Sequence, residues 1–295
     1  MHVKPTQPEV AYRDGARSDN AASGLISFTG AGPGAADLIT IRAARRLEEA
    51  DIVIWASSLV PRGILDYVRH GTSVLDSASM TFEDVIQVYN DHPSARIVRL
   101  HSGDPVIYGA IQEQIDWCVT HGRNFELVPG VSSLSAAAAA IGRELTIPGT
   151  SQSIILTRSA SRTSASMPPN EDITRFSATG CAMGIFLSAS RPLSLQRQLL
   201  AFGSAYTAST PVAVVAHATW PEEQVIISDL GHLAEAIRAT RTKTTVLVLV
   251  GDFITARPLR SHLYSPDFSH KYRKKSLYGS TRGRPAVKSN NNDTL

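Results

Sequence analysis

The sequence has little cysteine and lacks the spacing motifs of several enzyme classes. Its 295 residues include two cysteines, Cys118 and Cys181, which lie far apart and outside any CxxC pair. A disulfide framework and a cysteine-ligated metal site are therefore not expected. The nine histidines show neither HxH nor HExxH spacing, and neither a Walker A motif nor a complete G-x-S-x-G elbow occurs. These absences argue against metal catalysis and against a covalent nucleophile.

Long hydrophobic runs are also missing. No segment approaches the roughly 18 apolar residues of a membrane span. The first 23 residues lack the apolar core of a secretory signal, and we interpret residues 1–23 as a flexible N-terminal extension. We therefore expect no membrane partner and a reduced, cytoplasmic protein.

Net positive charge is confined to the C-terminal segment. Residues 271–295 hold seven basic residues and one acidic residue, a net charge of +6, whereas the whole chain carries +3. Residues 1–270 therefore carry −3. The basic segment is rich in Ser, Gly and Asn and cannot bury enough apolar surface to fold, so we expect a disordered tail over residues 271–295. We favour a solvated tail over a nucleic-acid site, and no nucleic-acid partner is expected.

Apolar runs alternate with segments of helical spacing along the chain. Residues 51–56 are nearly continuous in apolar residues, as in a strand buried on both faces, and helices are predicted from residue 64 to 68 and from 106 to 119. Such alternation is typical of an α/β fold with mostly parallel sheets. A second series of strands and helices begins after Pro148. We expect an N-terminal α/β domain over residues 24–143 and a C-terminal α/β domain over residues 148–256.

Four turns rich in small residues follow strand-like runs, at residues 30–34, 102–105, 130–133 and 216–219. In the second turn, Gly103 lets the backbone approach a ligand, and Asp104 can accept hydrogen bonds from a ligand or cap the next helix. Open α/β sheets bind ligands outside the carboxyl ends of their strands. The four turns therefore predict one large cleft, lined by backbone groups and hydroxyls.

The first turn also satisfies the G-x-G-x-x-G/A pattern of dinucleotide-binding oxidoreductases. That fold needs an acidic residue at the end of the second strand, whereas Asp51 stands at its start. Pro33 removes a backbone N–H where a pyrophosphate needs donors. We keep this class as an alternative.

His101 and His217 each follow an apolar run and could face the cleft, but we favour hydrogen-bonded structural histidines.

Taken together, the four turns resemble the signatures of the tetrapyrrole methylases. The resemblance runs from about residue 25 to residue 270 and rests on residues 30–40, 99–109, 128–133 and 211–219. It implies two α/β domains, a homodimer and S-adenosyl-L-methionine bound between the domains. Residues 53–60, 75–81 and 260–270 are most similar to the members that methylate carbon 11 of precorrin-4. A sibling enzyme acting at another carbon, on cobalt-precorrin-4, precorrin-3B or uroporphyrinogen III, stays open as an alternative.

The resemblance also assigns residues to the cofactor, position by position in the motifs. These are Pro33, Gly103, Asp104, Ile107, Ser132, Ser133, Leu187, Ala218 and Thr245. Asp104 is expected to position the cofactor through its ribose or amino group, and no catalytic acid or base is assigned. For the tetrapyrrole (precorrin) substrate we name Ser57, Ser58, Met80, Glu83 and Arg158. Its many carboxylates favour arginines, so Arg62 and Arg162 are further candidates.

Overall fold

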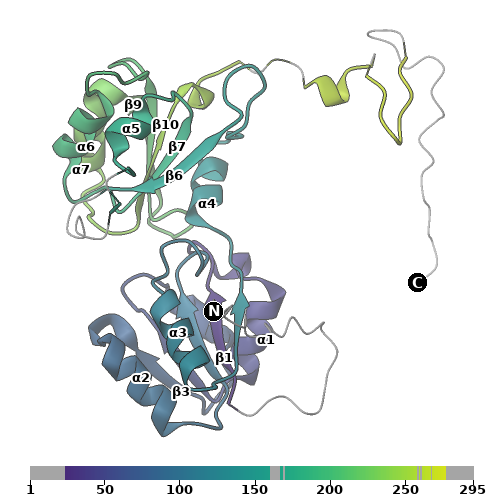
Figure 1. The fold of residues 1–295 in the computed structure, drawn as a ribbon, viewed down its shortest axis with the longest axis vertical. Helices are drawn as coiled ribbons and strands as arrows, with labels where there is room; N and C mark the ends of the chain where they lie inside the picture. Colours follow the sequence, from purple (N-terminus) through teal and green to yellow (C-terminus); the bar gives the residue numbers. More distant parts are fainter. Residues whose placement is uncertain are drawn as a thin grey trace, which may run out of the picture.

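The computed structural model describes residues 24–159, 167–168, 170–257, 259, 261–266 and 268–276. Two five-stranded sheets with flanking helices lie one above the other, and helix α4 lies between them (Figure 1). The expected α/β class is confirmed. The expected N-terminal extension, Arg162 and most of the basic tail lie outside the described residues.

The first sheet is parallel throughout and has the strand order β3-β2-β4-β1-β5. Because every strand runs in the same direction, the turns that follow β1, β4 and β5 meet at one edge. Its strands are β1 (Ile26–Gly30), β2 (Ile52–Trp55), β3 (Ser73–Asp76), β4 (Ile97–His101) and β5 (Phe125–Val128).

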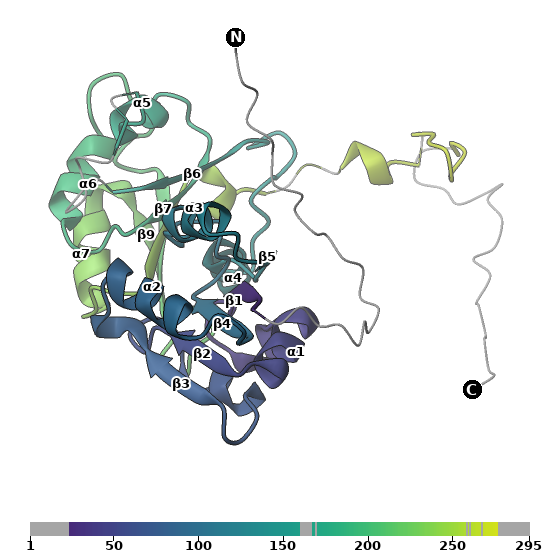
Figure 2. The ribbon, with the colours of Figure 1, turned by 60° about the horizontal axis from the view of Figure 1, so that its bottom comes forward.

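Helices cover both faces of the first sheet (Figure 2). Helix α1 (Ile41–Glu49) packs Leu47 on one face, whereas α2 (Phe82–Asp91) and α3 (Gln112–Thr120) pack Tyr89 and Cys118 on the other. A capping box begins α2 at Thr81, since its side chain and that of Asp84 each accept a backbone N–H. The short helix expected after residue 64 is instead a 3-10 helix, Arg62–Tyr67.

The second sheet is mixed and has the order β6-β7-β10-β8-β9. Of its four pairs of neighbouring strands in the described residues, only β6–β7 is parallel, so the expectation of mostly parallel strands is wrong for this sheet. The physical reason lies in the connections, because seven residues join β8 to β9 and a parallel crossover needs a dozen or more. The strands are β6 (Ile154–Arg158), β7 (Ala182–Phe186), β8 (Pro211–Ala216), β9 (Gln224–Asp229) and β10 (Val246–Val250).

The core of the second sheet includes a helix that precedes its first strand in the sequence. Helix α4 (Ser133–Ala140) packs Leu134, Ala136 and Ala137 against residues of β7, β8 and β10. The other face carries α5 (Ile173–Ser177), α6 (Pro192–Leu199) and α7 (Leu233–Ala239). The chain therefore passes from one core to the other at the start of α4, immediately after the turn that follows β5.

A short C-terminal segment, residues 261–276, lies away from both sheets (Figure 1). The guanidinium of Arg273 donates to the carbonyl oxygens of Leu263, Ser265 and Phe268. Residues 271–276, which we expected to belong to a disordered tail, thus form part of an internally bonded turn. No helix in the described parts of the chain is long and apolar enough to cross a membrane.

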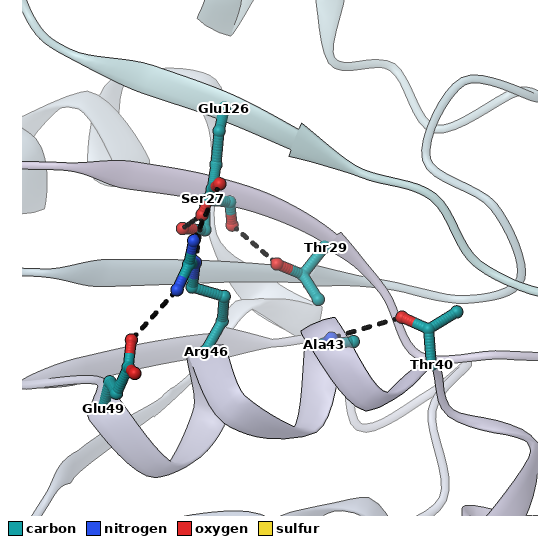
Figure 3. Close-up of polar contacts among 7 residues, drawn as sticks. All are labelled: Ser27, Thr29, Thr40, Ala43, Arg46, Glu49 and Glu126. Atoms are coloured by element: carbon teal, nitrogen blue, oxygen red, sulfur yellow. Dashed lines mark hydrogen bonds and ion pairs between the residues drawn. The ribbon is translucent and has the colours of Figure 1, made fainter. Parts of the chain in front are cut away.

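A polar cluster joins α1 to β1 and β5 (Figure 3). Arg46 donates through Nε and Nη2 to the two carboxylate oxygens of Glu126, and Ser27 Oγ donates to the same carboxylate at 2.6 Å. The Glu126 hydrogen bond raises the pKa of Arg46. Arg46 also reaches Glu49 at 3.0 Å, but Glu49 is the more exposed acid, with 49% of its side chain accessible against 20% for Glu126.

Replacing Glu126 by glutamine is expected to lower the free energy of unfolding by about 1–2 kcal/mol, because a half-buried guanidinium loses its bidentate anionic partner. The matched control, Glu49→Gln, removes only an exposed pair and should cost less than about 0.5 kcal/mol. Urea denaturation of both variants measures the difference. Equal losses in the two variants would contradict this account.

Candidate active site

Three of the four predicted turns pack backbone against backbone at the edge of the first sheet. Gly103 N donates to Gly32 O at 2.8 Å, and Gly32 N donates to Gly103 O at 3.3 Å. A Cβ added to Gly130 would lie 2.1 Å from Gly103 O and 2.8 Å from Gly30 Cα. Only glycine fits at such a contact, because any side chain would meet the main chain of two neighbouring turns.

The fourth turn, from the second sheet, contacts the first turn directly. Thr219 Oγ1 accepts a hydrogen bond from Ala35 N at 2.9 Å, and Trp220 Nε1 donates to Pro33 O at 3.0 Å. Pro33 is buried there. The structure therefore brings together all four turns that the sequence singled out. We call this group, residues 30–34, 102–105, 130–133 and 216–219, the interdomain junction.

The segment after Asp104 differs from the prediction. The expected helix from residue 106 starts only at Gln112, after a series of turns in which Tyr108 and Ala110 have positive φ. Asp104 Oδ1 accepts from Val106 N at 3.1 Å, so its side chain caps this turn and not a helix. The irregular backbone carries Tyr108 to the second sheet, where its ring lies 5.1 Å from that of Phe186.

The remaining cofactor candidates gather at one edge of the second sheet. Leu187 follows β7, Ala218 follows β8, and Thr245 precedes the antiparallel β10, which lies between those two strands. His217 N donates to Thr245 O at 2.9 Å and fixes this arrangement. Leu187 and Thr245 both have positive φ, and the Leu187 side chain is 60% exposed. Backbone strain and an exposed apolar side chain at one edge are typical of a ligand contact.

Several buried polar atoms at this edge have no hydrogen-bond partner among the described residues. They are Ser188 Oγ, His217 Nδ1 and Thr245 Oγ1. His101 Nε2, at the end of β4, is in the same state, and burial lowers the pKa of His101 to about 3, so the ring is neutral. Our expectation of hydrogen-bonded histidines is wrong for His101 and His217. An unpartnered buried polar atom costs free energy, which a ligand with complementary groups can recover.

These residues fit an adenosyl group. Leu187, Ala218 and Ile107 supply apolar surface, and the orphaned atoms near Thr245 supply polar contacts. On the opposite side of the junction, Asp104 offers a carboxylate acceptor. Ser132 caps α4 by accepting from Leu134 N, and Ser133 is the first residue of that helix, so both lie where the chain crosses between the sheets.

The substrate candidates occupy two places. Ser57 and Ser58 are exposed directly after β2, and Ser57 N donates to Asp76 at 3.1 Å. Met80 is half-buried against the first core, and Glu83 is exposed in the first turn of α2. The second place is the end of β6, where Arg158 lies. Burial raises the pKa of the Tyr108 phenol, and the nearby Arg158 opposes this rise. Arg62 is exposed at the start of its 3-10 helix.

Three further residues of this region, Trp220, Tyr108 and Ser188, were not among the predicted site residues. Trp220 immediately follows the fourth motif and holds the first turn through its indole N–H. No sequence signal indicates the positive φ of Tyr108 or the burial of the Ser188 hydroxyl. Their places follow from tertiary contacts, which a single sequence does not display.

The protein thus has an α/β fold in which four turns from two facing sheets meet at the interdomain junction. The chain matches the Tetrapyrrole (Corrin/Porphyrin) Methylases over residues 26–234. It therefore belongs to the tetrapyrrole methylases and is a methyltransferase. The dinucleotide-binding oxidoreductase alternative is thereby excluded, and S-adenosyl-L-methionine is the cofactor of the family.

Individual relatives agree with this assignment. The chain is 40% identical to a cobalt-precorrin-4 C(11)-methyltransferase of Methanocaldococcus jannaschii over 252 residues, which cover 84% of this chain and 96% of the relative. It is 39% identical to a precorrin-4 C(11)-methyltransferase of Rhodococcus erythropolis over 243 residues, which cover 81% and 96%.

Solved structures show the same fold. The cobalt precorrin-4 methyltransferase CbiF superposes with a TM-score of 0.74 at 35% identity, covering 79% of this chain and 96% of that chain. A uroporphyrin-III C-methyl transferase from Thermus thermophilus, complexed with S-adenosylhomocysteine, gives a TM-score of 0.65 at 26% identity, covering 79% and 94%.

Proposed function

We propose that the protein methylates carbon 11 of precorrin-4, giving precorrin-5, in cobalamin biosynthesis. The observation that carries this proposal is the similarity, over four fifths of the chain, to proteins named for that reaction. The uroporphyrin-III enzyme that shares the fold is only 26% identical. A cobalt-containing precorrin-4 is a second candidate substrate, because relatives with either name match at nearly equal identity.

When bound, the cofactor would supply a methyl group carried on a cationic sulfonium, and the rest of the cofactor would be released as a neutral thioether. Such a step needs alignment more than an acid or a base, and alignment alone can be worth roughly 7–11 kcal/mol. In this chain Asp104 and Thr245, from opposite sides of the interdomain junction, are proposed to hold the two ends of the adenosyl group. Leu187, Ala218 and Ile107 exclude water around it.

The same proposal extends to cellular form. We infer a cytoplasmic homodimer that binds neither nucleic acid nor membrane. In support, the edge strand β6 exposes Ile154 and Leu156, and the C-terminal segment exposes Leu263, Tyr264 and Tyr272. Light scattering coupled to gel filtration should give twice the chain mass of 31.7 kDa. A monomer at micromolar concentration would contradict the dimer.

Two assays test the proposed activity. Calorimetric titration should show binding of S-adenosylhomocysteine and none of NAD. Incubation with precorrin-4 and methyl-labelled S-adenosyl-L-methionine should add one labelled methyl group to the tetrapyrrole, as mass spectrometry measures. Absence of methyl transfer to both precorrin-4 and cobalt-precorrin-4 would refute the assignment within the family.

A further inference from the structure

Arg99 is a charged residue inside a strand that is otherwise apolar or aromatic. It lies on β4 between Val98 and Leu100 and shares a face with Ile97 and His101, toward α2 and α3. Burial lowers the pKa of its guanidinium, although not enough for an arginine to lose its charge. A permanent cation therefore sits beneath the carboxyl edge of the first sheet.

The contacts of this guanidinium are all with neutral groups. Nη1 donates to Ser77 Oγ at 2.9 Å and weakly to Ile54 O at 3.4 Å. Nε is fully enclosed and has no partner. Nη2 likewise makes no hydrogen bond within the described residues, but it is not among the enclosed atoms.

No carboxylate neutralises Arg99 in the described part of the chain. The acidic side chains on the adjoining loops accept hydrogen bonds from backbone N–H groups instead. Asp76 accepts from Ser57 N and Ala78 N, and Asp84 accepts from Thr81 N. A buried cation without a counter-charge is costly, and the cost is recovered when an anion binds beside it.

The position of Arg99 divides the sheet edge into two halves. Turns after β1, β4 and β5 form the interdomain junction, where the cofactor candidates lie. Arg99 points the other way, since its two hydrogen-bond partners belong to β2 and to the 3-10 helix Ser77–Ser79 after β3. Ser57, Ser58 and Met80, already candidates for substrate contact, stand on these same two connections.

We propose that Arg99 forms a carboxylate subsite for the tetrapyrrole, binding one peripheral acetate or propionate of the macrocycle. The proposal rests on the proposed function, because it takes a polycarboxylate tetrapyrrole as the ligand. Ser77 Oγ and the Ile54 carbonyl accept only from Nη1, and the free Nη2 is the donor left for the ligand. The subsite fixes the macrocycle at the β2–β3 half of the edge while the cofactor occupies the other half.

The test compares Arg99→Met and Arg99→Gln with a Ser77→Ala control. The glutamine variant keeps an amide donor for Ser77 but removes the charge. Fluorescence titration with uroporphyrin III, an octacarboxylate, should show about tenfold or greater weakening for both Arg99 variants. The KM for precorrin-4 should rise similarly, while the Kd for S-adenosylhomocysteine stays within about twofold. Ser77→Ala should change tetrapyrrole affinity by less than about threefold.

Two results would overturn the subsite. One is unchanged uroporphyrin III affinity in a folded Arg99 variant, with the glutamine variant deciding if the methionine variant does not fold. The other is an equal loss of uroporphyrin III affinity in Ser77→Ala. That result would mean that Arg99 acts only by holding the segment Ser77–Ser79 in place. Failure of the proposed function is distinguishable from both. In that case the wild-type protein would bind uroporphyrin III in an Arg99-dependent manner yet not methylate precorrin-4.

Discussion

Replacing Asp104 by alanine should weaken binding of S-adenosylhomocysteine by about tenfold to a hundredfold. The resemblance of residues 99–109 to the second family signature assigns this carboxylate to the ribose or amino group of the cofactor. A hydrogen bond to a charged group contributes about 1.5–3 kcal/mol, which corresponds to that range. Calorimetric titration measures the change directly.

The stability of this variant should hardly change. Asp104 Oδ1 accepts one hydrogen bond, from Val106 N, and Val106 is exposed, so water can replace the lost acceptor. Asp104→Asn is the matched variant, because it retains an oxygen acceptor for Val106 N and loses only the charge. Its affinity should fall between wild type and Asp104→Ala. Wild-type affinity in the alanine variant would show that the signature residue does not contact the cofactor.

Replacing Gly130 by alanine should have the largest effect on the fold itself. The added Cβ would lie 2.1 Å from Gly103 O and 2.8 Å from Gly30 Cα, and both are main-chain atoms that no rotamer change can move. We expect a loss of about 3 kcal/mol or more in the free energy of unfolding, together with loss of S-adenosylhomocysteine binding. The two effects are linked. The added Cβ would push apart the three turns that meet at Gly130, and one of these turns carries Asp104.

The control for this substitution is Gly63→Ala. Gly63 lies in the 3-10 helix Arg62–Tyr67, and the nearest atom to an added Cβ is Ala36 Cβ at 4.0 Å. The control should change stability by less than about 0.5 kcal/mol. Chemical denaturation of both variants provides the comparison. A Gly130→Ala protein as stable as the control would mean that the turns are not in contact.

Local sequence signals predicted the first sheet well. Its strands are short apolar runs between turn residues, and its turns carry glycine where neighbouring backbones leave no room for a Cβ, as at Gly30 and Gly130. The position of Asp51 was also correctly anticipated. It precedes β2 and pairs with Arg96, far along the strand from the edge that holds the turns.

The features that the sequence did not reveal depend on tertiary context. Strand β10 lies between β7 and β8 and runs antiparallel to both, which no local pattern encodes. The helix expected from residue 106 gives way to an irregular segment because Tyr108 reaches Phe186 on the other sheet. Arg99 is one charged residue in an apolar run, and only the folded structure shows that no anionic partner faces it within the described residues.

The position of the transferred methyl group tests the central claim most directly. The measurement is NMR of the product made from precorrin-4 and S-adenosyl-L-methionine with a ¹³C-labelled methyl group. The account predicts one labelled methyl, bonded to carbon 11 of the macrocycle. A label at any other carbon would contradict it and identify the protein as a sibling methylase.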